Sequence, residues 1–247
     1  MTTSRADLAG NQLAATYYWS FTTVAEGLTP PKASSKYPAA GASSVPVNSG
    51  IRVTFDQDMD ASTITPQTFL LTPTGSQSPV SGQVGYSSLT RVAIFRPASQ
   101  LVPNAAFTAS LSRGIKSAQG LSLASDITWE METGQNADAD APQVAAVFPA
   151  SNATGVDLAA AVTVQFNEAI DPTSLTEGSL TLDHDASGTL TYNDETNTLV
   201  LTPGSYLSPM QTYTASLTST VKDMAGNQLA AGAQWSFTTG AGGASTP

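Results

Sequence analysis

The segment Ala225-Gly-Asn-Gln-Leu-Ala230 is followed in this chain by Trp235-Ser-Phe-Thr-Thr239, and this succession of segments decides the fold. The same two segments occur near the start of the chain, at Ala9–Ala14 and Trp19–Thr23. Both pairs are separated by 216 residues, so the two regions align without a gap. Self-similarity at a fixed spacing is typical of proteins built from copies of one structural unit.

A third copy lies between these two in degraded form. It consists of Lys116-Ser-Ala-Gln-Gly120 and Trp129-Glu-Met-Glu-Thr133, so the three Trp residues stand at positions 19, 129 and 235. The front halves of two units also align, because Ile51-Arg-Val-Thr-Phe55 precedes Val162-Thr-Val-Gln-Phe166 by 111 residues. The chain therefore contains two complete units and part of a third.

These alignments predict the domain organisation. A chain of 247 residues is long enough for two domains of ordinary size. Because the chain begins inside a repeat, we expect it to be part of a longer array. We expect residues 1–23 to be the C-terminal remnant of a preceding repeat, 24–36 a linker, 37–134 a first complete domain, 135–147 a second linker, 148–240 a second complete domain and 241–247 a flexible tail.

Apolar and polar residues alternate within each unit. In the second unit Val162, Val164 and Phe166 are separated by single polar residues, and Trp235 and Phe237 flank Ser236. Alternation with period two predicts half-buried β-strands. We therefore predict an all-β fold of tandem β-sandwiches, each with about seven short strands.

The composition argues against several classes of function. Only 11% of the residues are charged, the net charge is −10, and there are nine Lys and Arg residues in total. Phosphate binding needs a clustered basic surface, so we expect no nucleic-acid partner. The chain has no Cys, which rules out disulfides and thiolate metal sites. No apolar run approaches the ~18 residues of a membrane span and no signal peptide is visible, so we expect no membrane insertion and an export signal outside this fragment.

Both complete units resemble the bacterial Ig-like domain family, which is found in surface-layer proteins, adhesins and accessory modules of secreted enzymes. The resemblance rests on this ordered set of segments: Phe148-Pro149, Val162–Phe166, Ile170-Asp171, Leu201-Thr-Pro203, Tyr213-Thr-Ala215, Asp223–Asn227 and Trp235–Thr239. It implies an Ig-like sandwich with a spacer, scaffold or binding role, and it transfers no catalytic residue. The middle unit departs from the pattern, because Ser117 stands where the loop Asp is expected.

A first group of candidate Ca²⁺ ligands follows a predicted buried strand. Asp56, Asp58 and Asp60 alternate along the first unit, and Glu168 and Asp171 hold matching places in the second. Ca²⁺ takes six to eight oxygen ligands, which alternating carboxylates can supply. The alternative, which we favour, is that Asp60 and Asp171 cap a turn and that the other acids are solvated.

A second group lies in the linker between the two complete units. Asp138 and Asp140 could share a Ca²⁺ ion with Glu168 or Asp171 of the following domain, and a bound ion would stiffen the array. The equivalent linker at residues 24–31 has a single carboxylate, so we favour a solvated linker without metal.

The remaining candidates are His184 and two aromatic residues. His184 is the only His, and it lies between two Asp residues, so it could help to hold a transition metal and any Ser-His-Asp triad would need it. We favour a solvated side chain and expect no enzyme. Tyr17 and Tyr18 lack aromatic counterparts in the last unit and are candidate sugar-stacking residues, whereas Trp129 and Trp235 share a repeat position and are expected in the cores.

These observations predict the function class. We expect a non-catalytic structural or adhesive spacer module of a large extracellular or cell-surface bacterial protein. Its partners would be neighbouring Ig-like repeats, a surface glycan, or a second molecule that pairs with the strand segment 9–23. The alternative is a Ca²⁺- or carbohydrate-binding accessory module of a secreted enzyme. Ca²⁺ is the one cofactor that the residues suggest.

Overall fold

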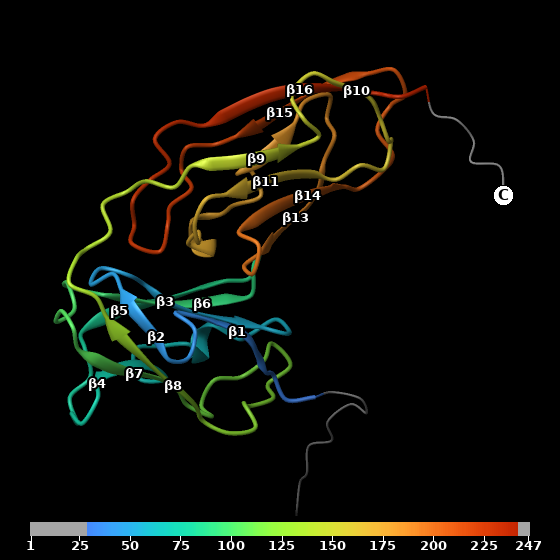
Figure 1. Cartoon of the computed structure of the whole chain (residues 1–247). Helices are drawn as coiled ribbons and strands as arrows, with labels where there is room; N and C mark the ends of the chain where they lie inside the picture. The colour runs from blue at the N-terminus through green and yellow to red at the C-terminus, as the bar shows by residue number, and fades with distance from the viewer. Residues whose placement is uncertain (1–28, 242–247) are drawn as a thin grey trace, which may run out of the picture.

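The computed structural model describes residues 29–241, and it is all-β (Figure 1). The first domain consists of two four-stranded sheets, with the strand orders β1-β3-β6-β5 and β2-β8-β7-β4. Its elements are β1 (Ala33–Tyr37), β2 (Ala42–Val45), β3 (Ile51–Phe55), the 3-10 turn η1 (Ala61–Thr63), β4 (Phe69–Pro73), β5 (Gly82–Ser87), β6 (Val92–Pro97), β7 (Ala106–Leu111) and β8 (Ile127–Thr133).

The second domain repeats this arrangement, with the strand orders β9-β11-β14-β13 and β10-β16-β15-β12. In both domains the second strand pairs in parallel with the last one, and the other pairs are antiparallel. The elements are β9 (Val144–Phe148), β10 (Ala153–Val156), β11 (Val162–Phe166), η2 (Pro172–Ser174), β12 (Leu180–Leu182), β13 (Gly188–Asn193), β14 (Thr198–Pro203), β15 (Thr212–Leu217) and β16 (Ala233–Thr239). The predicted fold class, tandem Ig-like β-sandwiches, is confirmed.

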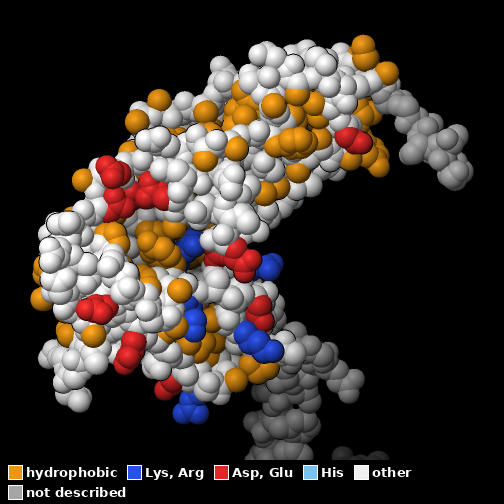
Figure 2. All heavy atoms as spheres, in the orientation of Figure 1, with side chains coloured by type: hydrophobic (Ala, Val, Ile, Leu, Met, Phe, Trp, Pro, Cys, Tyr) orange, Lys and Arg blue, Asp and Glu red, His pale blue; other side chains and the backbone are white. Residues whose placement is uncertain are grey.

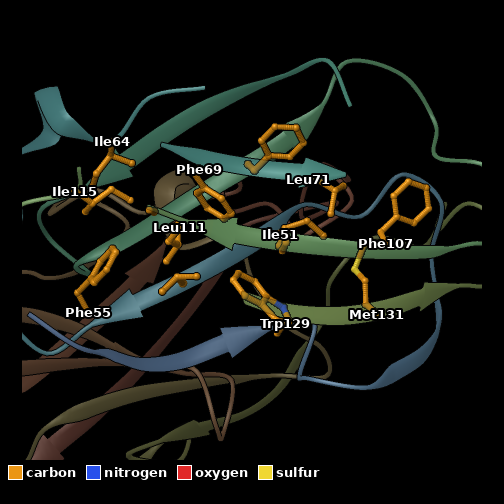
Figure 3. Close-up of a cluster of buried hydrophobic side chains, with 14 of the residues drawn as sticks. Ile51, Phe55, Ile64, Phe69, Leu71, Phe107, Leu111, Ile115, Trp129 and Met131 are labelled. Carbon is orange, nitrogen blue, oxygen red and sulfur yellow. The ribbon is translucent and has the colours of Figure 1, made fainter. Parts of the chain in front are cut away.

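Each sandwich closes around its own hydrophobic core. Trp129 lies in the first core beside Phe69, with 6.3 Å between the ring centroids (Figure 3). Its indole Nε1 donates a hydrogen bond to the carbonyl of Pro38 at 3.1 Å, and Trp235 donates the equivalent bond to Pro149 at 2.9 Å. A buried Trp needs a partner for its N–H group, and both repeats supply one at the same place. The prediction that these two Trp residues belong to the cores is confirmed.

The first strand of each domain begins earlier than the repeat alignment predicts. The segments Ala33–Tyr37 and Val144–Phe148 form the edge strands β1 and β9, although they overlap the expected linkers 24–36 and 135–147. Both segments are rich in Ala or Ser and show little of the alternation that marks a half-buried strand, which explains the difference. The expected repeat remnant at residues 1–23 and most of the expected tail lie outside the described residues.

The two short 3-10 turns have the expected caps. Asp60 accepts a hydrogen bond from the backbone N–H of Ser62 before η1, and Asp171 accepts one from Thr173 before η2. A carboxylate at this position satisfies a backbone donor that the turn leaves free. Within the described part of the chain, no helix is long and apolar enough to span a membrane.

Candidate functional site at the domain junction

The second domain rests on the outer face of the β1-β3-β6-β5 sheet of the first. Tyr37, Arg52, Ile94 and Gly85 lie in one row across this sheet, on the side that faces away from the domain's own core. Arg52 is only 3% exposed and Ile94 is fully buried, because the second domain covers them. The contacts come from one end of the second domain, made of η2, the β13–β14 turn at 194–197 and the loop at 223–227. We name this the loop end.

Arg52 is the central contact of this junction. Its guanidinium lies over the ring of Tyr37 from its own domain at 5.5 Å and over the ring of Tyr192 from the second domain at 5.8 Å. The same group lies 3.9 Å from the Asp194 carboxylate and donates a hydrogen bond of 3.4 Å to the carbonyl of Ile170. A buried arginine is tolerated only with such compensation.

Two further polar contacts join the domains. Arg96 pairs with the carboxylate of Asp171, whose other oxygen caps η2. The Asp194 carboxylate accepts hydrogen bonds from the hydroxyls of Ser35 and, at 2.8 Å, Thr54. Because both acids belong to the loop end and both sets of partners to the sheet face, these contacts fix how the loop end sits on the sheet.

The linker is bound to both domains by amide side chains. Asn48 of the first domain exchanges two hydrogen bonds of 2.8 Å with the backbone N–H and carbonyl of Asp138. Asn227 of the second domain donates hydrogen bonds to the carbonyls of Asp138 and Asp140, at 3.3 Å and 2.9 Å. The backbone of the linker is therefore held by both domains, although most residues of 135–140 are exposed to solvent, as the solvated linker that we favoured requires.

Three carboxylates converge beside the linker. Asp138 from the linker, Glu168 from the loop after β11 and Asp223 from the 223–227 loop each place one oxygen within 4.8 Å of the other two. Asp223 is buried, and its carboxylate accepts hydrogen bonds from the backbone N–H groups of Ala225 and Asn227, each at 2.8 Å. Acidic side chains gather at this junction in the space-filling view (Figure 2). Carboxylate oxygens in this arrangement can ligate a hard cation such as Ca²⁺.

The electrostatics of the cluster are unfavourable for three free anions. Burial, followed by the nearby charges of Asp138, Asp223 and Asp140, raises the pKa of Glu168 to about 7. A bound cation or a proton on Glu168 would relieve this repulsion. Two members of the cluster, Asp138 and Glu168, line the same junction cleft of about 360 Å³ as Arg52.

The structure separates the other acids that the sequence offered as ligands. Asp56 accepts a hydrogen bond from the backbone of Lys32, and Asp58 pairs with Arg91 at 2.8 Å. Asp60 caps η1 with its carboxylate. The shared site considered for these three acids is therefore not formed, because each is engaged by a different neighbour, and Asp60 caps a turn as we favoured. Asp171 likewise caps η2 and pairs with Arg96 rather than joining the cluster.

The remaining candidates do not form a site in the part of the chain that the structure describes. His184 lies on the surface, where its Nδ1 atom is 2.9 Å from the carboxylate of Asp183 and its Nε2 atom 3.0 Å from the Gln211 amide. The pair of His184 and Asp183 contains no nucleophilic side chain. Tyr17, Tyr18 and the strand segment 9–23 lie outside the described residues.

Sequence reasoning missed Asp223 as a member of the cluster. The sequence places this residue in a loop of the repeat, and its carboxylate accepts backbone hydrogen bonds within that loop. A signal was present, because the first repeat has Asp7 and Asn11 at the positions of Asp223 and Asn227, whereas the middle repeat has Ser117 and no Asn. The loop approaches the linker of the same junction because the two domains dock against each other. The repeat pattern does not reveal this docking.

Two tandem sandwiches of identical strand order, joined by an ordered linker, define a modular β-sandwich protein. The chain belongs to the bacterial Ig-like domain family, whose model matches residues 28–133 and 138–239.

The N-terminal part of the bacterial S-layer protein SbsC is 19% identical over 85% of this chain and 44% of that one, with a TM-score of 0.36. An L,D-transpeptidase from Mycobacterium smegmatis is 27% identical over 40% of each chain, with a TM-score of 0.31. A chimeric titin Z1Z2 is 11% identical over 87% of this chain and 97% of that one, with a TM-score of 0.33. This chain spans less than half the length of the first two structures. No curated protein shows a significant match.

Proposed function

We propose that this chain is a non-catalytic spacer of a bacterial cell-surface or extracellular protein, which holds two Ig-like domains at a fixed angle. The observation that carries the proposal is the buried Arg52, which is shared between aromatic rings of both domains. A spacer transmits position and force only if its joints resist bending. The polar contacts of Arg96 and Asp194 and the amide bonds to the linker support the same conclusion.

Three features favour a spacer over an enzyme. The family is defined by a fold, and its members share no reaction centre that could be transferred to this chain. The single His of the sequence is on the surface and pairs with an acid. The junction cleft holds charged groups that already serve the contact between the domains. A cell-surface or extracellular location follows from the family, and adhesion to a glycan would be an added property of the array.

Distance measurements between the two domains test this proposal. With one spin label on each domain, the wild-type chain should give a single narrow distance distribution. The Arg52→Ala variant should broaden it, because the loop end loses its central contact. Thr163→Ala, which changes the equivalent position of the second domain, should leave the distribution unchanged. A broad distribution for the wild-type chain would contradict a rigid spacer.

A second candidate function is Ca²⁺ binding at the junction, which is supported by the convergence of Asp138, Glu168 and Asp223. The three acids come from the linker and from two loops of the second domain, so one ion would tie the linker to the loop end. The backbone carbonyls of the linker lie close by, and Ca²⁺ accepts such ligands together with water. With this second function, the joint between the two domains would become stiffer where Ca²⁺ is abundant.

Titration with CaCl₂ distinguishes a spacer that binds Ca²⁺ at the junction from one that does not. If Ca²⁺ binds, the melting temperature of the wild-type chain should rise with Ca²⁺ concentration, as expected for a ligand of the folded state. Glu168→Gln should abolish the rise, whereas Glu195→Gln, in an exposed acid of the same cleft, should preserve it. An unchanged melting temperature at about 10 mM CaCl₂, well above the affinity range of extracellular Ca²⁺ modules, would exclude this second candidate and leave the spacer proposal intact.

A further inference from the structure

The second domain has a sheet face that is equivalent to the one buried in the first domain. Phe148, Thr163, Val200 and Thr191 form one row across β9, β11, β14 and β13. Their positions match those of Tyr37, Arg52, Ile94 and Gly85 in the first domain, with the same strand pairing. The two faces are therefore equivalent surfaces of one repeat, and only the first is covered in the described structure.

The uncovered row carries no charge and is partly exposed. Phe148 is 55% exposed and Thr191 is exposed, and Val200 and Thr163 are half-buried. Hydrophobic side chains gather over this part of the second domain in the space-filling view, with few charges among them (Figure 2). A contiguous patch of exposed hydrophobic side chains is a feature of interaction surfaces.

The loop end of the first domain and the uncovered face both lack the charged residue that their counterparts bring to the junction. Where the second domain places Asp194 against Arg52, the first domain has Ser88 at the equivalent turn position, and the uncovered face has Thr163 in place of Arg52. Both members of the charged pair are thus neutral. Ala118, which matches Met224, is exposed at the same loop end. The central charged pair of the internal junction is therefore absent from these two surfaces, and Asp60, which matches Asp171, would face Thr202 in place of Arg96.

We propose that the β9-β11-β14-β13 face binds the loop end of the first domain of a second copy of this chain. The contact repeats the geometry of the junction inside the chain, where an equivalent loop end covers an equivalent face. It joins two different surfaces of the molecule, so each copy retains one free face and one free loop end. Such a heterologous contact produces open, linear assemblies rather than closed dimers.

Sedimentation equilibrium of the whole chain tests this inference. The weight-average mass of the wild-type chain should rise with concentration from the monomer value of 25.3 kDa to more than twice that value. Phe148→Asp should hold the mass at the monomer value, because it places a charge in the contact. Thr191→Asp, which removes no packing from the core, should do the same and controls for a folding defect in the first variant. Met210→Asp changes an exposed apolar residue outside the sheet and should assemble as the wild type does.

Mixing two blocked variants identifies the mode of contact. Ala118→Asp blocks the loop end, and Phe148→Asp blocks the face, so each variant alone should stay monomeric. Their equimolar mixture should form a complex of twice the monomer mass and no larger species, because only one intact face and one intact loop end remain. Dimers of Ala118→Asp alone would show instead that two faces bind each other. A monomeric wild-type chain at about 1 mM, where even weak contacts are populated, would overturn the inference.

Discussion

The two domains build the same loop end with different chemistry. In the second domain the backbone N–H of Asp223 donates to the carbonyl of Asn227 at 3.0 Å, and in the first domain Ser117 donates to Leu121 at 2.8 Å. The backbone of the loop is thus the same, although an acid and an amide are replaced by a hydroxyl and an apolar side chain. Glu168 of the second domain likewise stands at the position of Gln57 in the first.

Gln57 and Glu168 show what this difference means for a junction. The Gln57 amide donates a hydrogen bond of 3.0 Å to the carbonyl of Thr29, in the segment that precedes its domain. Glu168 faces the corresponding linker, where its carboxylate lies close to that of Asp138. It can donate a hydrogen bond there only when it is protonated. The hydrogen bond of the neutral Gln57 amide needs no proton or cation, whereas the contact of Glu168 with its linker depends on one or the other. The fold of a repeat and the properties of its junction are therefore set by different residues.

Among substitutions that test this comparison, Arg52→Ala is expected to lower the unfolding free energy most. The substitution leaves Asp194 largely buried and without its counter-charge, and it removes the stacking on Tyr37 and Tyr192. Breaking a buried ion pair from one side costs about 3 kcal/mol of unfolding free energy. Urea denaturation, followed by the fluorescence of the core Trp residues, measures this loss.

Thr163→Ala is the matched control for this prediction. Thr163 occupies the place of Arg52 on the face that no domain covers in the described structure, so its loss should change the unfolding free energy by less than about 0.5 kcal/mol. Equal effects of the two substitutions would show that the domain junction contributes nothing to stability.

A smaller effect is expected from Asp171→Ala. This acid caps η2 and pairs with Arg96 across the junction, so its removal should lower the unfolding free energy by about 2 kcal/mol. Asp60 caps η1 in the same way but has no partner in another domain among the described residues, and Asp60→Ala should cost less. Urea denaturation of both variants compares the two caps. An equal loss would assign the whole effect to capping and none to the junction.

The fold was predictable because its determinants are local and occur twice. The alternation in Val162–Phe166 and the repeated Trp positions indicate buried strands, and the caps at Asp60 and Asp171 are visible as acids before short polar turns. The edge strands β1 and β9 were not predicted to their full length, because small residues in an edge strand leave no alternating pattern.

The site was predictable only in part, because it depends on how two domains dock. The linker acid Asp138 and Glu168 were candidates for one site, since the linker directly precedes the second domain, and their oxygens lie within 4.8 Å of each other. Asp223 is more than 50 residues further along the chain and reaches them through the bridge that pairs Ile170 with it. Nothing in the strand pattern indicates that Arg52, a charged residue on an outer face, is buried by the neighbouring domain.

The smallest effect on the unfolding free energy is expected from Glu168→Gln, and its size depends on pH. In the folded chain Glu168 keeps its proton up to a pKa of about 7, whereas in the unfolded chain it loses the proton near the ordinary value of 4.5. The folded state therefore binds more protons between these values, and the stability of the metal-free chain should fall as pH rises from about 4.5 to 7. Because Glu168 is only partly buried, solvent screening limits the change to about 1 kcal/mol.

Glu168→Gln should remove this pH dependence by making the second loop end resemble the first, which has Gln57 at the same place. In EDTA the variant should be more stable than the wild type at pH 8, by about 1 kcal/mol, and the two should be equally stable at pH 4.5. Glu195→Gln carries the same substitution on an exposed acid of the same cleft and should retain the wild-type pH dependence. If Glu168→Gln keeps the wild-type slope, the three carboxylates do not repel one another in solution, and the difference between the two loop ends has no electrostatic consequence.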